Sequence, residues 1–251
     1  MALRSFFYSF LLAIAALPGS AAAQDAELRV AVASNIAATM RLIAFRFEEI
    51  SGHDVVIISG STGKHYAQIR QGAPFDIFFS ADDTHPRLLE SDGIAISGSR
   101  FTYAIGKMVL WSPRQDLIDS AGAVLDRLGE LRIAIANPRF APYGKAAKEI
   151  LEARKLWKEH AGRIVRGENI NQAFHFVESG NVDMGFVAYS HIADSSRRDS
   201  GSFWIVPQDL YTPIIQQAVL LVENDIARQF MGYVKGDEAR QVFNDAGYDT
   251  P

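Results

Sequence analysis

Hydrophobic positions along the chain change repeatedly from strand spacing to helix spacing. Short runs rich in β-branched residues predict strands at 27–34, 54–59, 74–81, 131–136, 183–189 and 203–207, with longer extended runs at 100–112 and 214–222. Apolar residues at helical spacing predict helices at 36–51, 64–71, 84–91, 123–128, 145–156 and 171–179, and two more helices close the chain. Strands that alternate with helices indicate an α/β fold with mainly parallel sheets.

The two long extended runs suggest how the chain is divided. They bracket its middle, and as paired crossover strands they would join one lobe, made of residues 24–106 and 216–251, to another made of residues 107–215. The predicted strands are many for one sheet of ordinary size, which favours two sheets. A single large doubly wound sheet is the alternative that the pattern leaves open. Two lobes would leave a cleft between them, the usual place for a ligand.

The first residues are typical of an export signal. Arg4 precedes an apolar stretch from Phe6 to Leu17, and three alanines end at Ala23. We therefore expect residues 1–23 to be a cleaved signal peptide and the mature protein to be periplasmic. The apolar stretch is too short to span a membrane, and no membrane insertion of the mature chain is expected. The sequence has no cysteine, which excludes disulfides and a lipid anchor on cysteine.

Charge narrows the classes of partner. The signal peptide carries Arg4 and no acid, so the mature chain has 24 basic and 29 acidic residues, a net charge of −5. This balance offers no basic surface for nucleic acid and no polybasic patch for a membrane. If the protein binds a small anion, it must do so with local dipoles and hydrogen-bond donors rather than with an overall positive field.

The stretch "SGSTGKH" at residues 59–65 resembles a phosphate-binding loop, because it is glycine-rich and contains a Gly-Lys pair. The required pattern is Gly, four residues, then Gly-Lys-Ser/Thr. Here Ile58 stands in place of the first glycine and His65 in place of the hydroxyl residue, so a nucleotide site is not supported. A strand, a small polar turn and a helix N-terminus remain, and free N–H groups at such a terminus can bind an anion.

Four predicted strand-to-helix turns share this chemistry. The residues they offer as donors are Ser34 and Asn35, Ser61 and Thr62, Tyr143, and Ile170 through its backbone. Two turns would come from each lobe and surround an oxyanion, which accepts hydrogen bonds and donates none. Each turn also has an ordinary explanation, because serine and asparagine are common helix N-caps and Tyr143 could be a half-buried aromatic. Glu168, the one acid in these turns, is expected to point away.

The same segments carry a family resemblance. The sequence is similar, from about Leu28 to Gly247, to the periplasmic molybdate-binding proteins of ABC importers. Its most specific parts are "ASNIAATM", "VVIISGSTGKHYAQIRQGAPFDIFFSAD", "GSRFTYAIGKMVLWS", "NPRFAPYGKAAKEIL" and "DMGFVAY". The resemblance implies a type II periplasmic binding protein, whose two α/β lobes close on a tetrahedral oxyanion, molybdate or tungstate.

The resemblance also implies which residues contact the ligand. The contacts would be Ser34 and Asn35, Ser61 or Thr62, the turn at Tyr143, and a backbone N–H near Ile170. Many members have a tyrosine where this chain has Ala188, with Tyr189 one residue further on, and Tyr143 would supply the phenol instead. Members with octahedral coordination add carboxylates, and none is placed for that here. No cofactor and no direct protein ligand to molybdenum is therefore expected.

Other interpretations remain for the same donors. A receptor for another oxyanion such as sulfate belongs to the same class, whereas an exported enzyme could use the donors as an oxyanion hole. The enzyme hypothesis lacks a visible nucleophile, base or metal set, and the six histidines show no metal-ligand spacing. Lys64 and His65 are expected on a solvated helix face. The expected partners are the oxyanion and the subunits of an ABC permease, and the expected state is a monomer.

Overall fold

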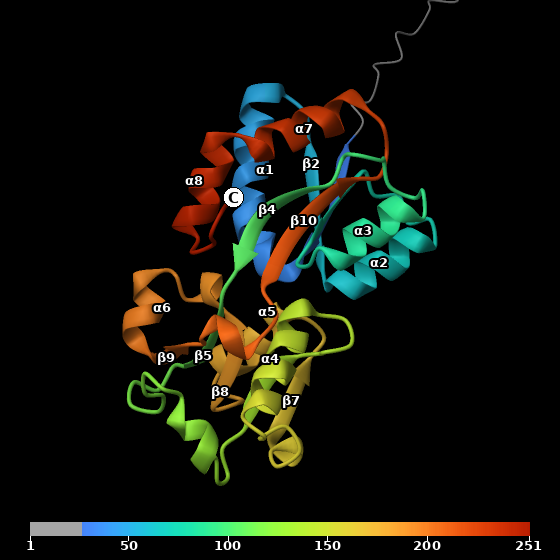
Figure 1. The fold of residues 1–251 in the computed structure, drawn as a ribbon. Helices are drawn as coiled ribbons and strands as arrows, with labels where there is room; N and C mark the ends of the chain where they lie inside the picture. The colour runs from blue at the N-terminus through green and yellow to red at the C-terminus, as the bar shows by residue number, and fades with distance from the viewer. Residues whose placement is uncertain (1–26) are drawn as a thin grey trace, which may run out of the picture.

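Ten strands form two separate five-stranded sheets in the computed structural model, which describes residues 27–251. Each sheet is the centre of a lobe, and the lobes lie one above the other in Figure 1. The predicted signal peptide at residues 1–23 lies outside the described part of the chain. None of the helices in that described part has the length and the apolar character needed to cross a membrane.

The first sheet combines N-terminal strands with one strand from near the C-terminus. Its order is β2-β1-β3-β10-β4. The strands are β1 (Leu28–Ala33), β2 (Val55–Gly60), β3 (Ile77–Ser80), β4 (Phe101–Gly106) and β10 (Ile214–Leu220). The pairs β1–β2 and β1–β3 are parallel, whereas β10 is antiparallel to β3 and to β4. One strand therefore opposes the other four.

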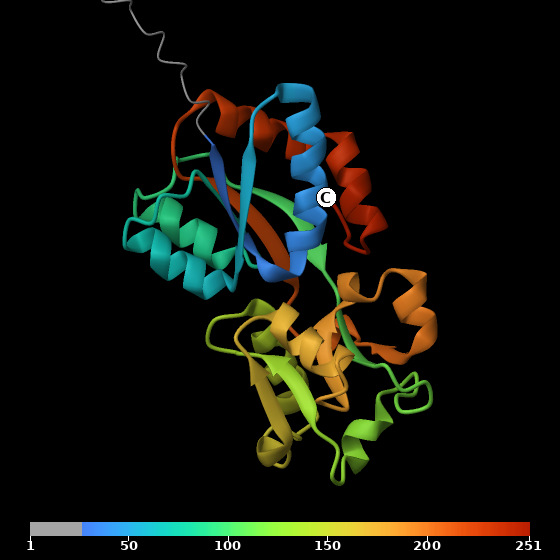
Figure 2. The same cartoon turned by 180° about the vertical axis from the view of Figure 1, so that it is seen from behind.

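Helices cover both faces of this sheet (Figure 2). One layer contains α1 (Ala37–Ser51), α7 (Asp225–Lys235) and α8 (Asp237–Asp245), and the other contains α2 (Thr62–Arg70) and α3 (Thr84–Ser91). Side chains of neighbouring strand residues point to opposite faces. Accordingly Phe79 belongs to the core under α1 and α7, and Phe78 belongs to the core under α2 and α3.

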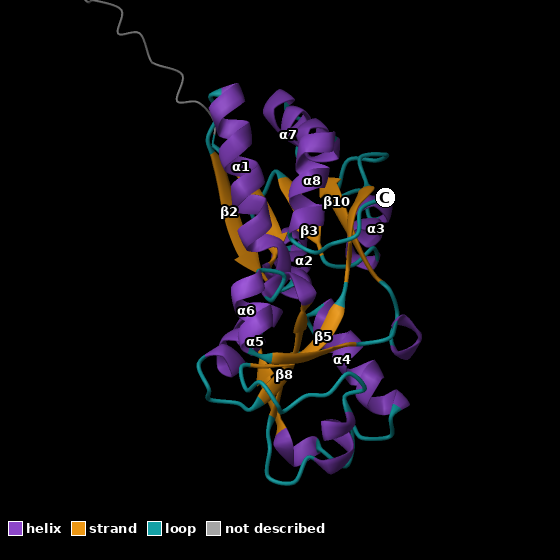
Figure 3. Cartoon of the chain, turned by 90° about the vertical axis from the view of Figure 1, so that its left-hand side faces the viewer, coloured by secondary structure: helices purple, strands orange, loops and turns teal. Residues whose placement is uncertain are grey.

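The second sheet repeats this arrangement with different strands. Its order is β7-β6-β8-β5-β9, with β6 parallel to β7 and β8, and β5 antiparallel to β8 and β9. The strands are β5 (Met108–Ser112), β6 (Ile133–Ala136), β7 (Ile164–Gly167), β8 (Met184–Ala188) and β9 (Ser202–Ile205). The α-helices of this lobe are α4 (Pro142–Ala153), α5 (Ile170–Glu178) and α6 (Ser195–Ser200), as Figure 3 shows.

Short 3-10 helices complete the chain in both lobes. They are η1 (Ser34–Ile36), η2 (Ala123–Arg127), η3 (Ala161–Arg163), η4 (Tyr189–His191) and η5 (Gln208–Leu210). Most predicted elements are present, with three differences. The run at 123–128 forms η2 rather than an α-helix, and neither β7 nor α6 was predicted. β7 has only two apolar residues and α6 none, so neither carries the hydrophobic period on which such predictions depend.

Two neighbouring strands connect the lobes. β4 ends at Gly106 in the first sheet and β5 begins at Met108 in the second, so the extended run at 100–112 is divided between the sheets. The chain returns to the first sheet at Ile214, which lies opposite Gly106 in the β4–β10 pair. The C-terminal tail then pairs with β4, because Asp249 and Ile105 exchange backbone hydrogen bonds.

Phe79 tests the packing of the first lobe. Its side chain is completely buried, with ring centroids 5.3 Å from Tyr103 and 6.2 Å from Phe230. Phe79→Ala should lower the free energy of unfolding by about 3–5 kcal/mol, through lost contacts and the cavity left behind. Phe45→Ala on the exposed side of α1 is the control, with an expected change within about 0.5 kcal/mol. Urea unfolding measures both, and equal losses would contradict this account of the core.

Candidate functional site

Four strand-to-helix turns meet at one small cavity between the lobes. Its lining is Ala33, Ser34, Asn35, Gly60, Ser61, Thr62, Ala81, Ala141, Pro142, Tyr143, Asn169 and Ile170. All six residues proposed from the sequence are in this set, and both lobes contribute. None of these lining residues is charged. The structure thus gathers neutral donors at one point, as the chemistry of a bound oxyanion requires.

Strand direction explains why the turns converge. β1 and β2 are parallel neighbours that lead into η1 and α2, and β6 and β7 are parallel neighbours that lead into α4 and α5. The carboxyl ends of parallel strands lie at the same edge of a sheet, and the helices that follow begin there. The first backbone N–H groups of a helix have no partner within it, so they are free to bind a ligand.

Helix capping by side chains leaves most of these N–H groups free. Neither Ser61, the residue before α2, nor Ala141, the residue before α4, makes a side-chain capping bond. The turn at η1 has none either. Of the helices that begin at this cavity, α5 alone has a side-chain cap, because Asn169 Oδ1 accepts from the Gln172 N–H at 3.0 Å. Ser34 and Asn35 are thus not N-caps, and Ser61 holds the N-cap position of α2 without a capping bond from its side chain.

Two buried hydroxyl groups at this cavity have no hydrogen-bond partner. They are Ser61 Oγ and Tyr143 Oη. Tyr143 is 1% exposed, so the half-buried explanation of this residue is also wrong. Burial raises the pKa of Tyr143 well above its ordinary value, which keeps the hydroxyl protonated and able to donate. A buried polar group without a partner costs about 1–3 kcal/mol, so these hydroxyls favour an acceptor ligand.

The other predicted side chains already have partners within the protein. Thr62 Oγ1 accepts from the Ala81 N–H at 3.0 Å. Asn35 Nδ2 donates to Gln216 Oε1 at 2.7 Å and lies 3.2 Å from Tyr248 Oη. The side chains of Thr62 and Asn35 thus shape the turns, and their backbone N–H groups are what they offer to a ligand.

Comparison with known proteins identifies the family. The family described as bacterial extracellular solute-binding protein matches residues 28–249. The molybdate-binding protein ModA of Azotobacter vinelandii is 46% identical, covering 90% of this chain and 91% of its own length. ModA of Rhodobacter capsulatus is 42% identical, with 94% and 91% covered. This chain belongs to the bacterial extracellular solute-binding protein family.

Solved structures confirm the predicted two-lobed fold of this solute-binding protein. The Azotobacter vinelandii periplasmic molybdate-binding protein superimposes with a TM-score of 0.86 at 44% identity, covering 89% of this chain and 99% of that one. A sulfate-binding protein from Mycobacterium tuberculosis superimposes with a TM-score of 0.70 at 12% identity, which shows a shared fold alone. The relatives above are binding proteins, and the enzyme alternative finds no support in them.

Contacts across the cleft hold the lobes of this solute-binding protein together. The Gly63 N–H at the start of α2 donates to Phe140 O at 2.8 Å, and Lys64 Nζ lies 2.7 Å from Glu168 Oε2. Glu168 is paired on the rim and is not part of the cavity lining. Any side chain at residue 63 would press on this contact, because a Cβ there would lie 3.1 Å from Phe140 Cα and O.

One of the two residues expected on a solvated helix face is in fact buried. His65 is 3% exposed, its Nε2 lies 3.2 Å from Val32 O, and desolvation lowers its pKa. The expectation for His65 was wrong because helical spacing alone does not show which face meets the sheet. Among the described residues, no group of three or more His, Cys, Asp and Glu is placed to hold a metal ion.

Sequence reasoning missed the polar residues that support the cavity. Gln216 on β10 binds Asn35, and Tyr248 Oη contacts Asn35 O at 2.9 Å and Ser190 Oγ of the second lobe at 2.8 Å. Gln216 stands in the apolar run of a buried strand, which is the one local sign that could have marked it. Tyr248 has no such sign.

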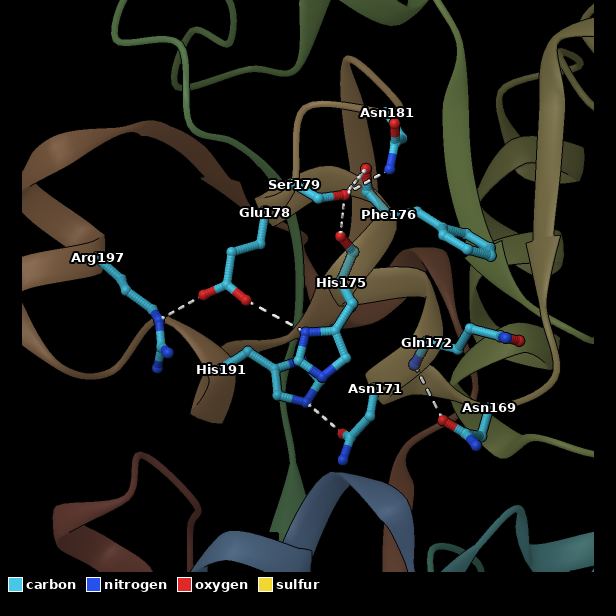
Figure 4. Close-up of polar contacts among 10 residues, drawn as sticks. All are labelled: Asn169, Asn171, Gln172, His175, Phe176, Glu178, Ser179, Asn181, His191 and Arg197. Atoms are coloured by element: carbon cyan, nitrogen blue, oxygen red, sulfur yellow. Dashed lines mark hydrogen bonds and ion pairs between the residues drawn. The ribbon is translucent and has the colours of Figure 1, made fainter.

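A half-buried histidine, His191, supports the start of α5, where Ile170 lies (Figure 4). His191 Nε2 is 2.8 Å from Asn171 Oδ1, so that nitrogen carries the proton and donates. The ring stacks on Phe174 with centroids 4.6 Å apart. Burial lowers the pKa of His191 to about 3, with smaller contributions from His175 and Arg197. The imidazole is therefore neutral at physiological pH.

This low pKa predicts how stability depends on pH. The folded pKa of His191 is about 3, whereas the ordinary value is 6.5, so between them the unfolded chain binds more protons. The stabilisation is complete above pH 6.5 and is lost as the pH falls towards 3. One group contributes at most about 1.4 kcal/mol per pH unit. His191→Gln should reduce the slope of unfolding free energy against pH between 4 and 6.

Urea unfolding at several pH values measures this slope. His175→Gln is the matched control, because His175 lies near His191 but its side chain is largely exposed. It should leave the slope of the wild type almost unchanged. Identical slopes in the wild type and His191→Gln would contradict the role given to His191.

Proposed function

We propose that the protein captures molybdate, and tungstate with it, as a tetrahedral oxyanion in the cavity between its lobes. The observation that carries the proposal is the pair of buried hydroxyls without partners, Ser61 Oγ and Tyr143 Oη, at a cavity with uncharged walls. The ligand of the ModA relatives supports the choice of oxyanion. Because the lobes meet around the cavity, a bound anion would be withdrawn from water.

The anion would be held by donors alone. We assign side-chain contacts to the hydroxyls of Ser34, Ser61 and Tyr143, and backbone contacts to the N–H groups of Asn35 and Ile170. Ser61 is preferred to Thr62 because Thr62 Oγ1 already accepts from Ala81 N, whereas Ser61 Oγ has no partner. Hydrogen bonds to an ionised acceptor are short and strong, so several neutral donors can stabilise a dianion without a counter-ion.

Selectivity would follow from the same donor set. A protonated phosphate needs an acceptor for its O–H, and the described lining offers no carboxylate. Sulfate carries no proton and must be distinguished by size, since the shorter bonds of sulfate would leave some donors out of reach. Sulfate is thus the alternative ligand that a titration must test.

We further propose that the protein is periplasmic, acts as a monomer and delivers the anion to an ABC permease. Residues 1–23 have the pattern of a signal peptide, and a related solved structure is titled a periplasmic protein. The monomer is supported by a cavity that residues of one chain line from both lobes. The proposed lobe limits, 24–106 with 216–251 and 107–215, place the crossovers close to Gly106 and Ile214.

Calorimetric titration of the purified protein with molybdate, tungstate, sulfate and phosphate tests the ligand. Molybdate and tungstate should bind tightly, and the melting temperature should rise with their concentration. At a ligand concentration 100 times Kd, the added stability is about 2.7 kcal/mol. Sulfate and phosphate should give little heat and little thermal shift. Tight sulfate binding in the absence of molybdate binding would replace this proposal with a sulfate receptor.

Two single substitutions test the hydroxyl contacts. Ser61→Ala and Tyr143→Phe should each weaken molybdate binding by about 1–3 kcal/mol, because each removes a buried donor to an ionised acceptor. Ser59→Ala on the exposed part of β2 and Tyr233→Phe on α7 are matched controls that should keep the wild-type affinity. An unchanged Kd in Ser61→Ala or Tyr143→Phe would remove that residue from the proposed site.

A further inference from the structure

Gln216 is a completely buried amide at the junction of the lobes. It lies on β10, opposite Ala104 of β4 and two residues after Ile214, where the chain enters the first sheet. It is not part of the cavity lining, and no residue beside it in sequence is expected to bind the ligand. A polar side chain in such a position needs partners for both ends of its amide.

One end of the Gln216 amide is fixed. Its Oε1 accepts from Asn35 Nδ2 at 2.7 Å and lies 3.3 Å from Tyr103 Oη. Tyr103 also donates to Ser80 O at 2.9 Å. With Asn35 Nδ2 as donor, the facing atom must be the oxygen of Gln216, so the orientation follows from the hydrogen-bond network. The Nε2 group is thereby directed away from Asn35, and it has no partner.

The other unpartnered group in this region is the Tyr143 hydroxyl. Tyr143 comes from α4 in the second lobe and reaches Gly106 at the end of β4. A Cβ on Gly106 would lie 2.2 Å from Tyr143 Oη and 3.2 Å from Gln216 Nε2. The two polar atoms therefore occupy neighbouring positions that exist because residue 106 has no side chain. The amide nitrogen can only donate and the phenol oxygen can accept, and neither atom has a hydrogen-bond partner in this structure.

We propose that Gln216 is a positioning residue for Tyr143, an inference that rests on the proposed oxyanion site. With the anion bound, Gln216 Nε2 would donate to the phenol oxygen, which leaves the single hydroxyl hydrogen of Tyr143 for the anion. A donor behind a hydroxyl also polarises it, so the outward hydrogen bond becomes stronger. The same Gln216 fixes Asn35 through its other end, and one residue of a connecting strand thus orients a donor group from each lobe.

The substitution Gln216→Glu distinguishes the positioning of Tyr143 from the support that Gln216 gives to Asn35. The carboxylate keeps an oxygen for Asn35 Nδ2 but replaces the donor that faces Tyr143 with an acceptor. The Tyr143 hydroxyl would then turn to the carboxylate and away from the anion. We expect molybdate affinity to fall at least about thirtyfold, part of it from the added charge and part through Tyr143.

A double-mutant cycle isolates the part that acts through Tyr143. Molybdate titrations compare the wild type, Gln216→Glu, Tyr143→Phe and the double variant. In the Tyr143→Phe background, Gln216→Glu should cost about tenfold less affinity than in the wild type, because only charge repulsion remains. Gln217→Glu adds the same charge at the next position of β10, where the side chain binds Arg100 and Thr102, and should change the affinity less than threefold.

The titrations distinguish failure of the proposed function from failure of the role given to Gln216. If the wild type does not bind molybdate, the proposed function fails. If the wild type binds and Tyr143→Phe weakens binding, but Gln216→Glu has the same effect in both backgrounds, Gln216 does not position Tyr143. Gln216→Met, which removes the donor without adding charge, repeats the cycle if Gln216→Glu does not fold. In the cycle with Gln216→Met, a coupling between residues 216 and 143 of less than about threefold in Kd would also overturn the inference.

Discussion

The structure depends on one electrostatic constraint, which is that hydrogen-bond donors are buried together without acceptors. Helix N-termini from both lobes and the hydroxyls of Ser61 and Tyr143 meet in one small volume with no carboxylate in its lining. Such a group of donors is costly to bury alone and strongly favours an anion. The low net charge of the protein does not oppose this, because the donors act at contact distance.

The repeated sheet topology makes this convergence possible. Each sheet places two parallel strands next to each other, β1 with β2 and β6 with β7, and each pair ends in two helix-forming turns. The connecting strands β4 and β10 join the two sheets where Gly106 lies opposite Ile214. The tail strengthens this junction, because Asp249 pairs with Ile105 and Tyr248 contacts Ser190 of the other lobe. The site is therefore a property of the whole fold.

Local features of the sequence were enough to predict an α/β fold and six of the residues that line the cavity, whereas the choice of two lobes over one large sheet also rested on the family resemblance. The alternation of periods located most strands, and small polar turns after strands pointed to Ser34 and Ser61. The supporting residues depend on contacts across long separations, since Gln216 is 181 positions from Asn35 and Tyr248 is 213 positions from it. The spacing of hydrophobic residues within one segment cannot reveal contacts between residues so far apart in the sequence. The error for His65 has the same origin, because its burial depends on Val32 of a distant strand.

In the proposed function, ligand binding and lobe closure use different hydrogen-bond donors. Binding of the anion can therefore control closure of the lobes. The Gly63 N–H donates to Phe140 O and is not available to the anion, whereas the Ser61 hydroxyl two residues earlier has no partner. The Lys64–Glu168 pair is exposed on the rim, and such pairs contribute about 0–1 kcal/mol. This rim pair alone thus adds little to closure of the lobes, and we propose that the donors of the cavity add a larger share once an acceptor is bound. Under the proposed function, closure that depends on the ligand would give a permease a shape to recognise only when the anion is inside.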